Sequence, residues 1–320
     1  VKLIKKSKNL YDNNEFNILS QGNNKFYKGS YKIENVDEFI ELYTKVCFDL
    51  NIECCFLERS INNNNKSVLT NIDDANLIKI DIDLKYNKRD TLEHLYHEEY
   101  ISELVNLYFK ELKKYINLDE SCSFGKNKII NNLKFYVLER REGYIDLQTN
   151  KVKDGLHIIV PNFLINNVIL HKVRLDLLKD DAFKKLHQKF KQLNNLEDFI
   201  DKSVISTNPW FLYGSSKPFK KPYLLTKIYK YNKKEKLYTT ISEQKFNTII
   251  EDNLKLVKQL TNFDAKQLIN PISNDILTQL EREINIGNSN KNFESIHNAI
   301  NNNINITFVE PDSKVHSEKD

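Results

Sequence analysis

Several patterns that would identify a particular class of protein are missing from this chain. No methionine occurs in 320 residues, and we therefore expect the chain to be a segment of a longer polypeptide. No run of about 18 apolar residues is present, so the sequence predicts no membrane-spanning helix and no membrane partner. The basic amino terminus lacks the apolar stretch and cleavage site of a secretory signal.

Cysteine is also scarce, with four residues that form neither a regularly spaced framework nor a CxxC pair (Cys47, Cys54, Cys55 and Cys122). No ligand set with zinc spacing occurs, and neither HExxH nor the phosphate-binding loop GxxxxGK[ST] is present. These absences favour a reducing, intracellular location and exclude a disulfide scaffold.

A strong charge imbalance is absent as well. Forty-eight basic and 44 acidic residues leave a net charge of +4 and a pI near 8.6. This balance is less basic than that of a dedicated nucleic-acid-binding domain, although the basic stretches 217–222 and 229–236 are compatible either with a groove or with solvated loops. An apolar content of 40% excludes a disordered or fibrous chain.

Hydrophobic periodicity predicts alternating strands and helices through most of the chain. The pattern predicts an α/β (α+β) fold with a mixed sheet. Predicted helices cover about 36–47, 89–116, 164–193 (one or two helices), 243–260 and 274–284. Predicted strands cover 54–61, 77–86, 132–140, 156–161, short segments within 199–205 and 210–214, and a hairpin of 223–231 with 236–242.

From this pattern we expect four regions. They are a polar lead-in over 1–34, a core over 35–242, a helical extension over 243–285 and an Asn-rich linker or tail over 286–320.

The first candidate site lies on the strand predicted at 77–86. Side chains alternate in a strand, so Ile80 and Ile82 are expected to face the core while Asp81 and Asp83 share the opposite face. Two carboxylates about 7 Å apart on one strand can ligate a hard divalent cation. An isolated DxD is equally compatible with a solvated polar face or with the metal pair of a glycosyltransferase.

A second candidate is the segment KDGLHIIVPN, in which Lys153, Gly155 and His157 enter a strand. Lys153 and His157 suit contacts to a polyphosphate, and Gly155 allows a ligand to approach the backbone. A single histidine at the start of a strand is also a common structural residue. His94 and His97, in the predicted helix at 89–116, carry no metal-binding signature.

The third candidate is FIDKSVISTNPWFLYGSSKP, residues 199–218. It combines a carboxylate, Asp201, with a Ser215-Ser216-Lys217 cluster suited to phosphate contacts. Trp210, Tyr213 and Phe219 are available to stack a nucleic-acid base. Taken alone, a Gly-Ser-Ser-Lys-Pro segment is often only a turn.

In this order the three segments resemble the motifs of the archaeo-eukaryotic primase superfamily. The sequences of the second and third motifs are most similar to those of the N-terminal primase domain of primase-helicases from large nucleocytoplasmic DNA viruses. They are also similar to those of PrimPol. The resemblance covers about residues 35–240, and FYVLERREG, which ends in Arg140 and Arg141, fits the viral pattern.

The resemblance implies a two-module catalytic core with an RRM-like sheet and a role for each matching residue. It implies two ions, Mg²⁺ or Mn²⁺, held by three carboxylates, and a triphosphate held by the residues of the later motifs. The implied metal ligands are Asp81, Asp83 and Asp201, and the implied nucleotide-binding residues are Lys153, His157, Ser215, Ser216 and Lys217.

Two departures limit the match. Gly155 stands where many members carry a serine, so a hydroxyl contact to the nucleotide is in doubt. Asn208, Pro209, Trp210 and Leu212 stand in the region where PrimPol has arginines.

The resulting hypothesis is a primase or primase-polymerase that makes primers on single-stranded DNA from nucleoside triphosphates. Its expected partners are the template, the nucleotides and a covalently linked helicase domain, and its expected location is the host cytoplasm or a viral replication site. Two alternatives remain: a catalytically silent module that binds single strands and aids helicase loading, and a sugar-nucleotide transferase.

Overall fold

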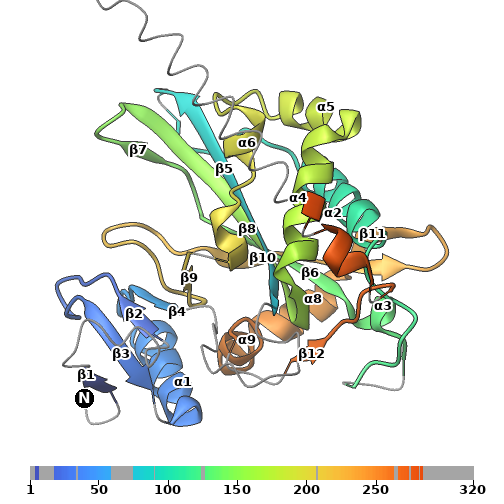
Figure 1. Cartoon of the computed structure of the whole chain (residues 1–320). Helices are drawn as coiled ribbons and strands as arrows, with labels where there is room; N and C mark the ends of the chain where they lie inside the picture. The colour runs from blue at the N-terminus through green and yellow to red at the C-terminus, as the bar shows by residue number, and fades with distance from the viewer. Residues whose placement is uncertain are drawn as a thin grey trace, which may run out of the picture. The chain divides into compact units, whose positions relative to one another are not determined.

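The computed structural model describes residues 4–6, 18–33, 35–58, 75–89, 91–123, 127–206, 208–262, 266–273, 275–280 and 282–283. The chain divides into two units, Val1–Leu277 and Thr278–Asp320. The first unit is an α+β fold with two β-sheets (Figure 1). In the second, residues 278–280 and 282–283 are helical.

The larger sheet is built around one long strand, β8 (Lys151–Asn166). Strand β5 (Ala75–Asn87) pairs antiparallel with the whole of one edge, from Ala75 opposite Asn166 to Asn87 opposite Lys151. Three strands share the other edge: β7 (Tyr144–Asp146), β6 (Lys134–Glu139) and β12 (Gln267–Leu268), of which only β12 is parallel to β8. Beyond β6, the hairpin β10 (Leu224–Asn232) and β11 (Leu237–Thr240) completes the sheet.

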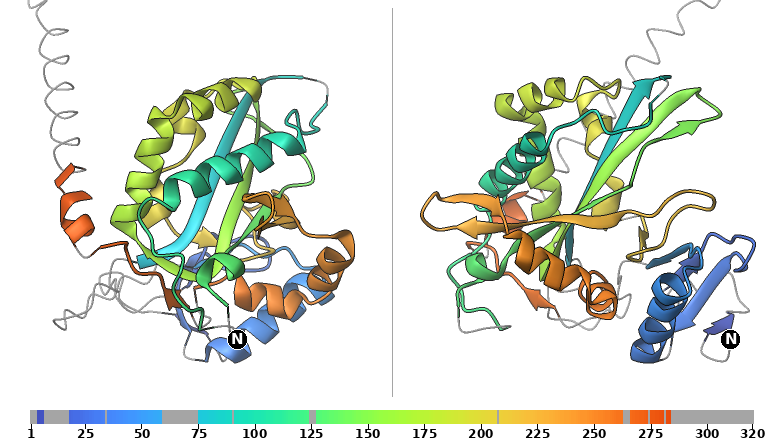
Figure 2. Two further views of the ribbon diagram at one scale, coloured as in Figure 1. Left: turned by 90° about the vertical axis from the view of Figure 1, so that its right-hand side faces the viewer. Right: turned by 180° about the vertical axis from the view of Figure 1, so that it is seen from behind.

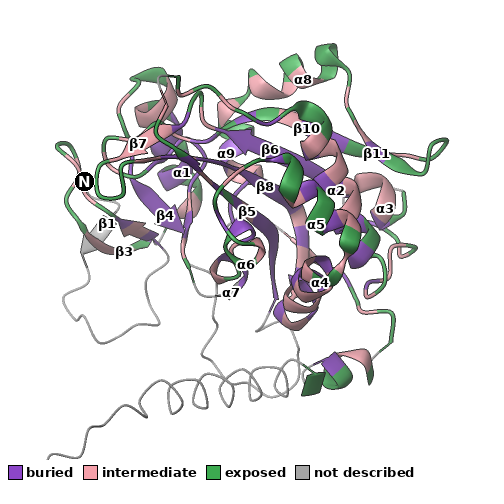
Figure 3. Cartoon of the chain, turned by 90° about the horizontal axis from the view of Figure 1, so that it is seen from above, coloured by how far each residue is buried: buried purple, intermediate pink, exposed green. Residues whose placement is uncertain are grey.

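One face of this sheet is covered by three helices, α2 (Glu98–Leu112), α4 (Asn167–Lys179) and α5 (Asp181–Lys189) (Figure 2). The helices bury the apolar side chains that alternate along the strands, as in the edge-to-face contact of Tyr108 in α2 with Phe135 in β6. Strands β5, β6 and β8 are largely buried and lie at the centre of the first unit (Figure 3).

A smaller antiparallel sheet packs against the other face. Its strands are β1 (Ile4–Lys6), β3 (Gly29–Ile33), β2 (Ile18–Ser20), β4 (Phe56–Glu58) and β9 (Trp210–Phe211), in that order. Helix α1 (Val36–Thr44), which continues into a π-helical turn at Lys45–Asp49, joins this sheet to the core. One hydrophobic cluster contains Phe39 and Phe56 from this part and Tyr136 and Ile228 from the larger sheet, so the two sheets share a core.

The remaining helices are short. They are α3 (Ile129–Asn132), α6 (Leu196–Phe199), α7 (Ser203–Ser206), α8 (Glu243–Ile250) and α9 (Asn253–Gln259). Helix α9 packs against α1, and α8 packs against β10.

Most of the predicted strands and helices occur, with three corrections. The helix predicted from residue 89 begins at Glu98, because the preceding loop is fixed instead by contacts of His94. The strand predicted within 199–205 is the pair of short helices α6 and α7. The helix predicted over 243–260 is two helices, since the Asp252 side chain caps the second by accepting a hydrogen bond from the Lys255 backbone N–H.

Other expectations fall partly on residues outside the described set. Of the strand predicted over 54–61, β4 covers 56–58, and residues 59–74 lie outside the described residues. The expected linker over 286–320 lies outside them too. Within the expected lead-in over 1–34, the structure contains β1, β2 and β3.

Candidate active site

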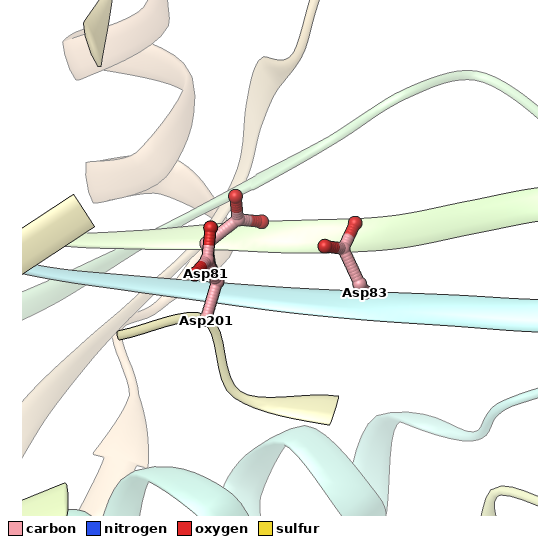
Figure 4. Close-up of side chains that lie close together, drawn as sticks. All are labelled: Asp81, Asp83 and Asp201. Carbon is pink, nitrogen blue, oxygen red and sulfur yellow. The ribbon is translucent and has the colours of Figure 1, made fainter. Parts of the chain in front are cut away.

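Three carboxylates meet on the open face of the larger sheet. Asp81 and Asp83 lie on β5, pointing away from the helices, as the alternation of this strand predicts. Asp201 lies in the turn between α6 and α7, which runs along the free edge of β5, where its backbone N–H donates to the Asp81 carbonyl at 3.0 Å. One oxygen from each carboxylate lies within 4.8 Å of the others (Figure 4).

The buried carboxylate of Asp81 is poorly compensated by hydrogen bonds. Asp81 Oδ1 is buried without a hydrogen-bond donor among the described residues. Burial, followed by the charges of Asp83 and Asp201, raises the pKa of Asp81 well above its usual range. Loss of solvent, and then the Asp201 charge, also raises the pKa of Asp83.

Asp201 is oriented by its own turn. The backbone N–H and hydroxyl of Ser203 donate to its two carboxylate oxygens at 2.8 and 2.5 Å. The triad therefore concentrates negative charge at one fixed point. A divalent cation would relieve this repulsion, and an all-oxygen donor set suits Mg²⁺ or Mn²⁺.

His157 lies beside the triad on β8, opposite Leu138 of β6 and Asp81 of β5. Its ring stacks on Tyr223, with centroids 3.7 Å apart, and contacts Trp210 at 4.4 Å. Nε2 lies 3.4 Å from Asp81 Oδ1. Burial, and then the positive charges of Arg140 and Lys217, holds the pKa of His157 well below its usual range, so the ring is a neutral hydrogen-bonding group.

Arg140, at the end of β6, supplies a fixed positive charge in the same cleft. Its guanidinium lies over the Tyr223 ring, 4.0 Å from the centroid, and 5.1 Å from the Tyr144 ring. The described residues provide no carboxylate partner for it, and its Nε is buried without an acceptor. Arg140 is therefore held by aromatic rings and has hydrogen-bond donors left for an anion.

Arg140 lies in the sequence FYVLERREG, but the sequence pattern assigned it no function. The available signal was a basic residue directly after a buried strand and two positions from Leu138. The pairing of Leu138 with His157, which brings Arg140 to the cleft, depends on a strand register that the sequence did not reveal.

Lys217 and Lys153 lie on the cleft wall with the triad. Lys217 acts on the triad through its charge, which opposes the rise in the pKa of Asp81 and of Asp83. Lys153 is paired with Asp146 at 2.7 Å, so a ligand would have to share or displace that partner.

Ser215 and Ser216, in contrast, are buried outside the cleft lining. The Ser215 hydroxyl accepts from the Phe56 N–H at 3.1 Å, and the Ser216 hydroxyl donates to the Lys220 carbonyl at 2.6 Å. Their backbone N–H groups donate to carbonyls of Leu212 and Cys54. In this structure the two serines shape the turn that carries Lys217, and neither their hydroxyls nor their backbone N–H groups are free for phosphate.

The three aromatic side chains named for base stacking differ in position. Trp210 lines the cleft beside His157, whereas Tyr213 is buried in the core and accepts from the Leu225 N–H. Phe219 is 73% exposed, in a left-handed backbone conformation held by the Glu53 carboxylate, which accepts from its N–H at 2.7 Å.

The cleft has a volume of about 490 Å³, and its lining includes the three carboxylates together with the cations Arg140, Lys153 and Lys217. Such an arrangement can bind a metal-bound polyphosphate, because anionic ligands and their metal ions require both charge signs within a few ångströms.

Residues 23–229 match the family model for the N-terminal AEP (archaeo-eukaryotic primase) domain of C962R protein. The chain belongs to this family. A search of curated proteins found no match.

As an archaeo-eukaryotic primase domain of the viral primase-helicase type, the chain carries its acidic triad inside the matched region, on β5 and in the α6–α7 turn. Membership of the family accounts for the order of the three motifs. In the part of the chain that the structure describes, no helix is long and apolar enough to cross a membrane.

Proposed function

We propose that this primase domain synthesises primers on single-stranded DNA by metal-dependent nucleotidyl transfer from nucleoside triphosphates. The observation that supports this most strongly is the acidic triad, whose oxygens lie within 4.8 Å of one another in the same cleft as Arg140, His157 and Lys217. A module that only bound nucleic acid would gain nothing from clustered carboxylates that repel phosphate.

In the proposed reaction the 3′-oxygen of one nucleotide attacks the α-phosphorus of the next, and pyrophosphate leaves. Asp81, Asp83 and Asp201 would hold two divalent ions, which would lower the pKa of the attacking hydroxyl and neutralise the leaving pyrophosphate. The geometry of the protein ligands is set by the β5 backbone and the Ser203 hydrogen bonds to Asp201.

The cationic side chains of the cleft would position the triphosphate. Arg140 and Lys217 supply charge and donors, and neutral His157 supplies a hydrogen-bonding ring that Tyr223 and Trp210 keep in place. Lys153 would join this set by exchanging Asp146 for phosphate. Side chains that are already held in place without ligand lose less conformational entropy when the triphosphate binds.

The family suggests two further features. We infer that the larger sheet and its helices correspond to an RRM-like module and the smaller sheet to a second module. We also infer that a helicase domain follows in the natural protein, as the primase-helicase context of the family suggests.

Primer synthesis on unprimed single-stranded DNA, with labelled nucleotides and Mg²⁺ or Mn²⁺, tests the proposal. We expect products from the wild-type chain and a loss of at least about a hundredfold in Asp81→Asn/Asp83→Asn. Asp119→Asn/Asp181→Asn carries the same charge change at exposed positions and is expected to retain activity. A folded wild-type chain that binds single strands but neither starts nor extends a primer would favour the silent binding module instead.

A further inference from the structure

A second groove lies at the other end of β6 and β10 from the cleft. It has a volume of about 660 Å³ and is bounded by β6, the β10–β11 hairpin and α8. Four lysines line it: Lys134, Lys230, Lys233 and Lys245. None of its lining residues is acidic, and five of them carry hydroxyls (Tyr231, Thr239, Thr240, Ser242 and Thr248).

The positive charges in this groove are not neutralised within the described part of the chain. Lys134 and Lys230 are direct cross-strand partners on β6 and β10, and no ion pair involves either of them or Lys245. Burial, and then the charges of Lys230, Lys245 and Lys255, lowers the pKa of Lys134. Like charges placed directly opposite each other destabilise a sheet, which suggests that an anionic ligand compensates them.

We propose that this groove binds the phosphate backbone of single-stranded nucleic acid at a distance from the acidic cleft. The four lysines come from β6, β10, the β10–β11 turn and α8, so the positive charge is supplied along several elements of the groove. Lysines and hydroxyls make up most of the polar lining, which suits a sequence-independent contact to the nucleic-acid backbone.

The position of the groove fits a strand that also reaches the cleft. Lys134 is the first residue of β6 and Arg140 directly follows its last residue, so six positions separate them, or about 20 Å at the rise of a strand. Between them the face is closed by the hydrophobic cluster that includes Tyr136 and Leu256. The groove is therefore a separate binding surface. Its assignment to a nucleic-acid strand rests on the proposed function.

The test is binding of a fluorescent single strand of about 30 nucleotides to the full chain, measured by anisotropy across a range of salt concentrations. The variant is Lys230→Gln/Lys233→Gln/Lys245→Gln, which leaves half-buried Lys134 in place. The matched control is Lys113→Gln/Lys185→Gln/Lys191→Gln, with the same charge change on exposed lysines elsewhere.

We expect the groove variant to lose about ten- to a hundredfold in affinity and to reduce the slope of log K against log salt by about 2, because each lost phosphate contact lowers that slope by about 0.7. The control is expected to change the slope by less than half as much. Equal losses in both variants, or no loss in the groove variant, would overturn the proposal.

Two further measurements separate this proposal from the proposed function. Mn²⁺ binding is expected to be unchanged in the groove variant, and the groove-dependent strand binding is expected to persist in Asp81→Asn/Asp83→Asn. Loss of strand binding in the acidic variant would contradict a separate groove. A chain that binds strands through the groove but makes no primers would support the groove proposal. It would contradict only the proposed reaction.

Discussion

Gly155 faces Asp83 across the β5–β8 pair, at the position where the resemblance leads one to expect serine. Its φ is +151°, and a Cβ there would lie 2.2 Å from the Ile82 carbonyl oxygen, far inside contact distance. We predict that Gly155→Ser destabilises the protein by at least about 2 kcal/mol and displaces the acidic pair, instead of adding a useful hydroxyl.

Thermal unfolding and primer synthesis check this prediction. Gly29→Ala is the matched control, because a Cβ at Gly29 meets nothing closer than 3.4 Å and its φ is not positive. A Gly155→Ser variant as stable and active as the control would show that the backbone at this position can relax.

Tyr223 supports both His157 and Arg140 through its ring. We predict that Tyr223→Phe, which keeps the ring, retains the KM for nucleoside triphosphate, whereas Tyr223→Ala raises it about tenfold with little change in Mn²⁺ binding. Steady-state kinetics and a Mn²⁺ titration measure the two effects. An equal loss in both variants would assign the role to the hydroxyl.

Individual site residues could be predicted to very different degrees. Asp81 and Asp83 were readable because strand alternation alone puts both on one face, and Asp201 because the motif order resembles a family. Arg140 was missed because its place depends on strand register. The sequence does not distinguish serines that contact phosphate from serines that shape a turn, and in the structure the two hydroxyls bond to the Phe56 N–H and the Lys220 carbonyl.

The loop before α2 is anchored by His94, which bridges two strands of the larger sheet. Nδ1 lies 2.9 Å from the buried Asp154 carboxylate on β8, and Nε2 lies 2.8 Å from the Arg140 carbonyl at the end of β6. The hydrogen bond with Asp154 is the main cause that raises the pKa of His94. Only the protonated ring donates to both acceptors at once.

Because the pKa of His94 is raised in the folded protein, the stability that its hydrogen bonds contribute decreases as the pH rises. The His94 contribution is complete below the unfolded pKa of about 6.5 and is lost as the pH rises through the higher folded value. We predict that wild type exceeds His94→Gln in stability by about 1 kcal/mol at low pH, with the difference shrinking as the pH rises through the raised folded pKa. Urea unfolding at several pH values measures it, and a constant difference would mean that His94 acts only by packing.

Secondary-structure elements were best predicted where one period dominated the sequence. The alternation of β5 and the hairpin β10–β11 were recognisable in this way. Short elements were not, since α6 and α7 have four residues each and are fixed by contacts such as the Arg174 side chain with the Ile200 carbonyl. The pairing of β2, β4 and β9 joins segments that only the folded chain brings together.

For the molecule as a whole, the acidic triad is expected to cost stability when no metal is bound. Asp81 is buried beside two other carboxylates, and none of the described residues donates a hydrogen bond to its Oδ1. We therefore predict that Asp81→Asn stabilises the metal-free protein by about 1 kcal/mol while abolishing activity. Thermal unfolding in the presence of a chelator measures this change in stability. A destabilised variant would contradict the view that repulsion among the three carboxylates destabilises the metal-free fold.

In the function we propose, this primase domain holds two divalent ions between its three carboxylates when a nucleoside triphosphate is bound. Electron paramagnetic resonance titration with Mn²⁺ and a non-hydrolysable triphosphate counts them directly. We predict two ions per wild-type chain, and at most one in Asp201→Asn. A wild-type chain that binds no Mn²⁺, or that binds it equally well without the three carboxylates, would contradict the account.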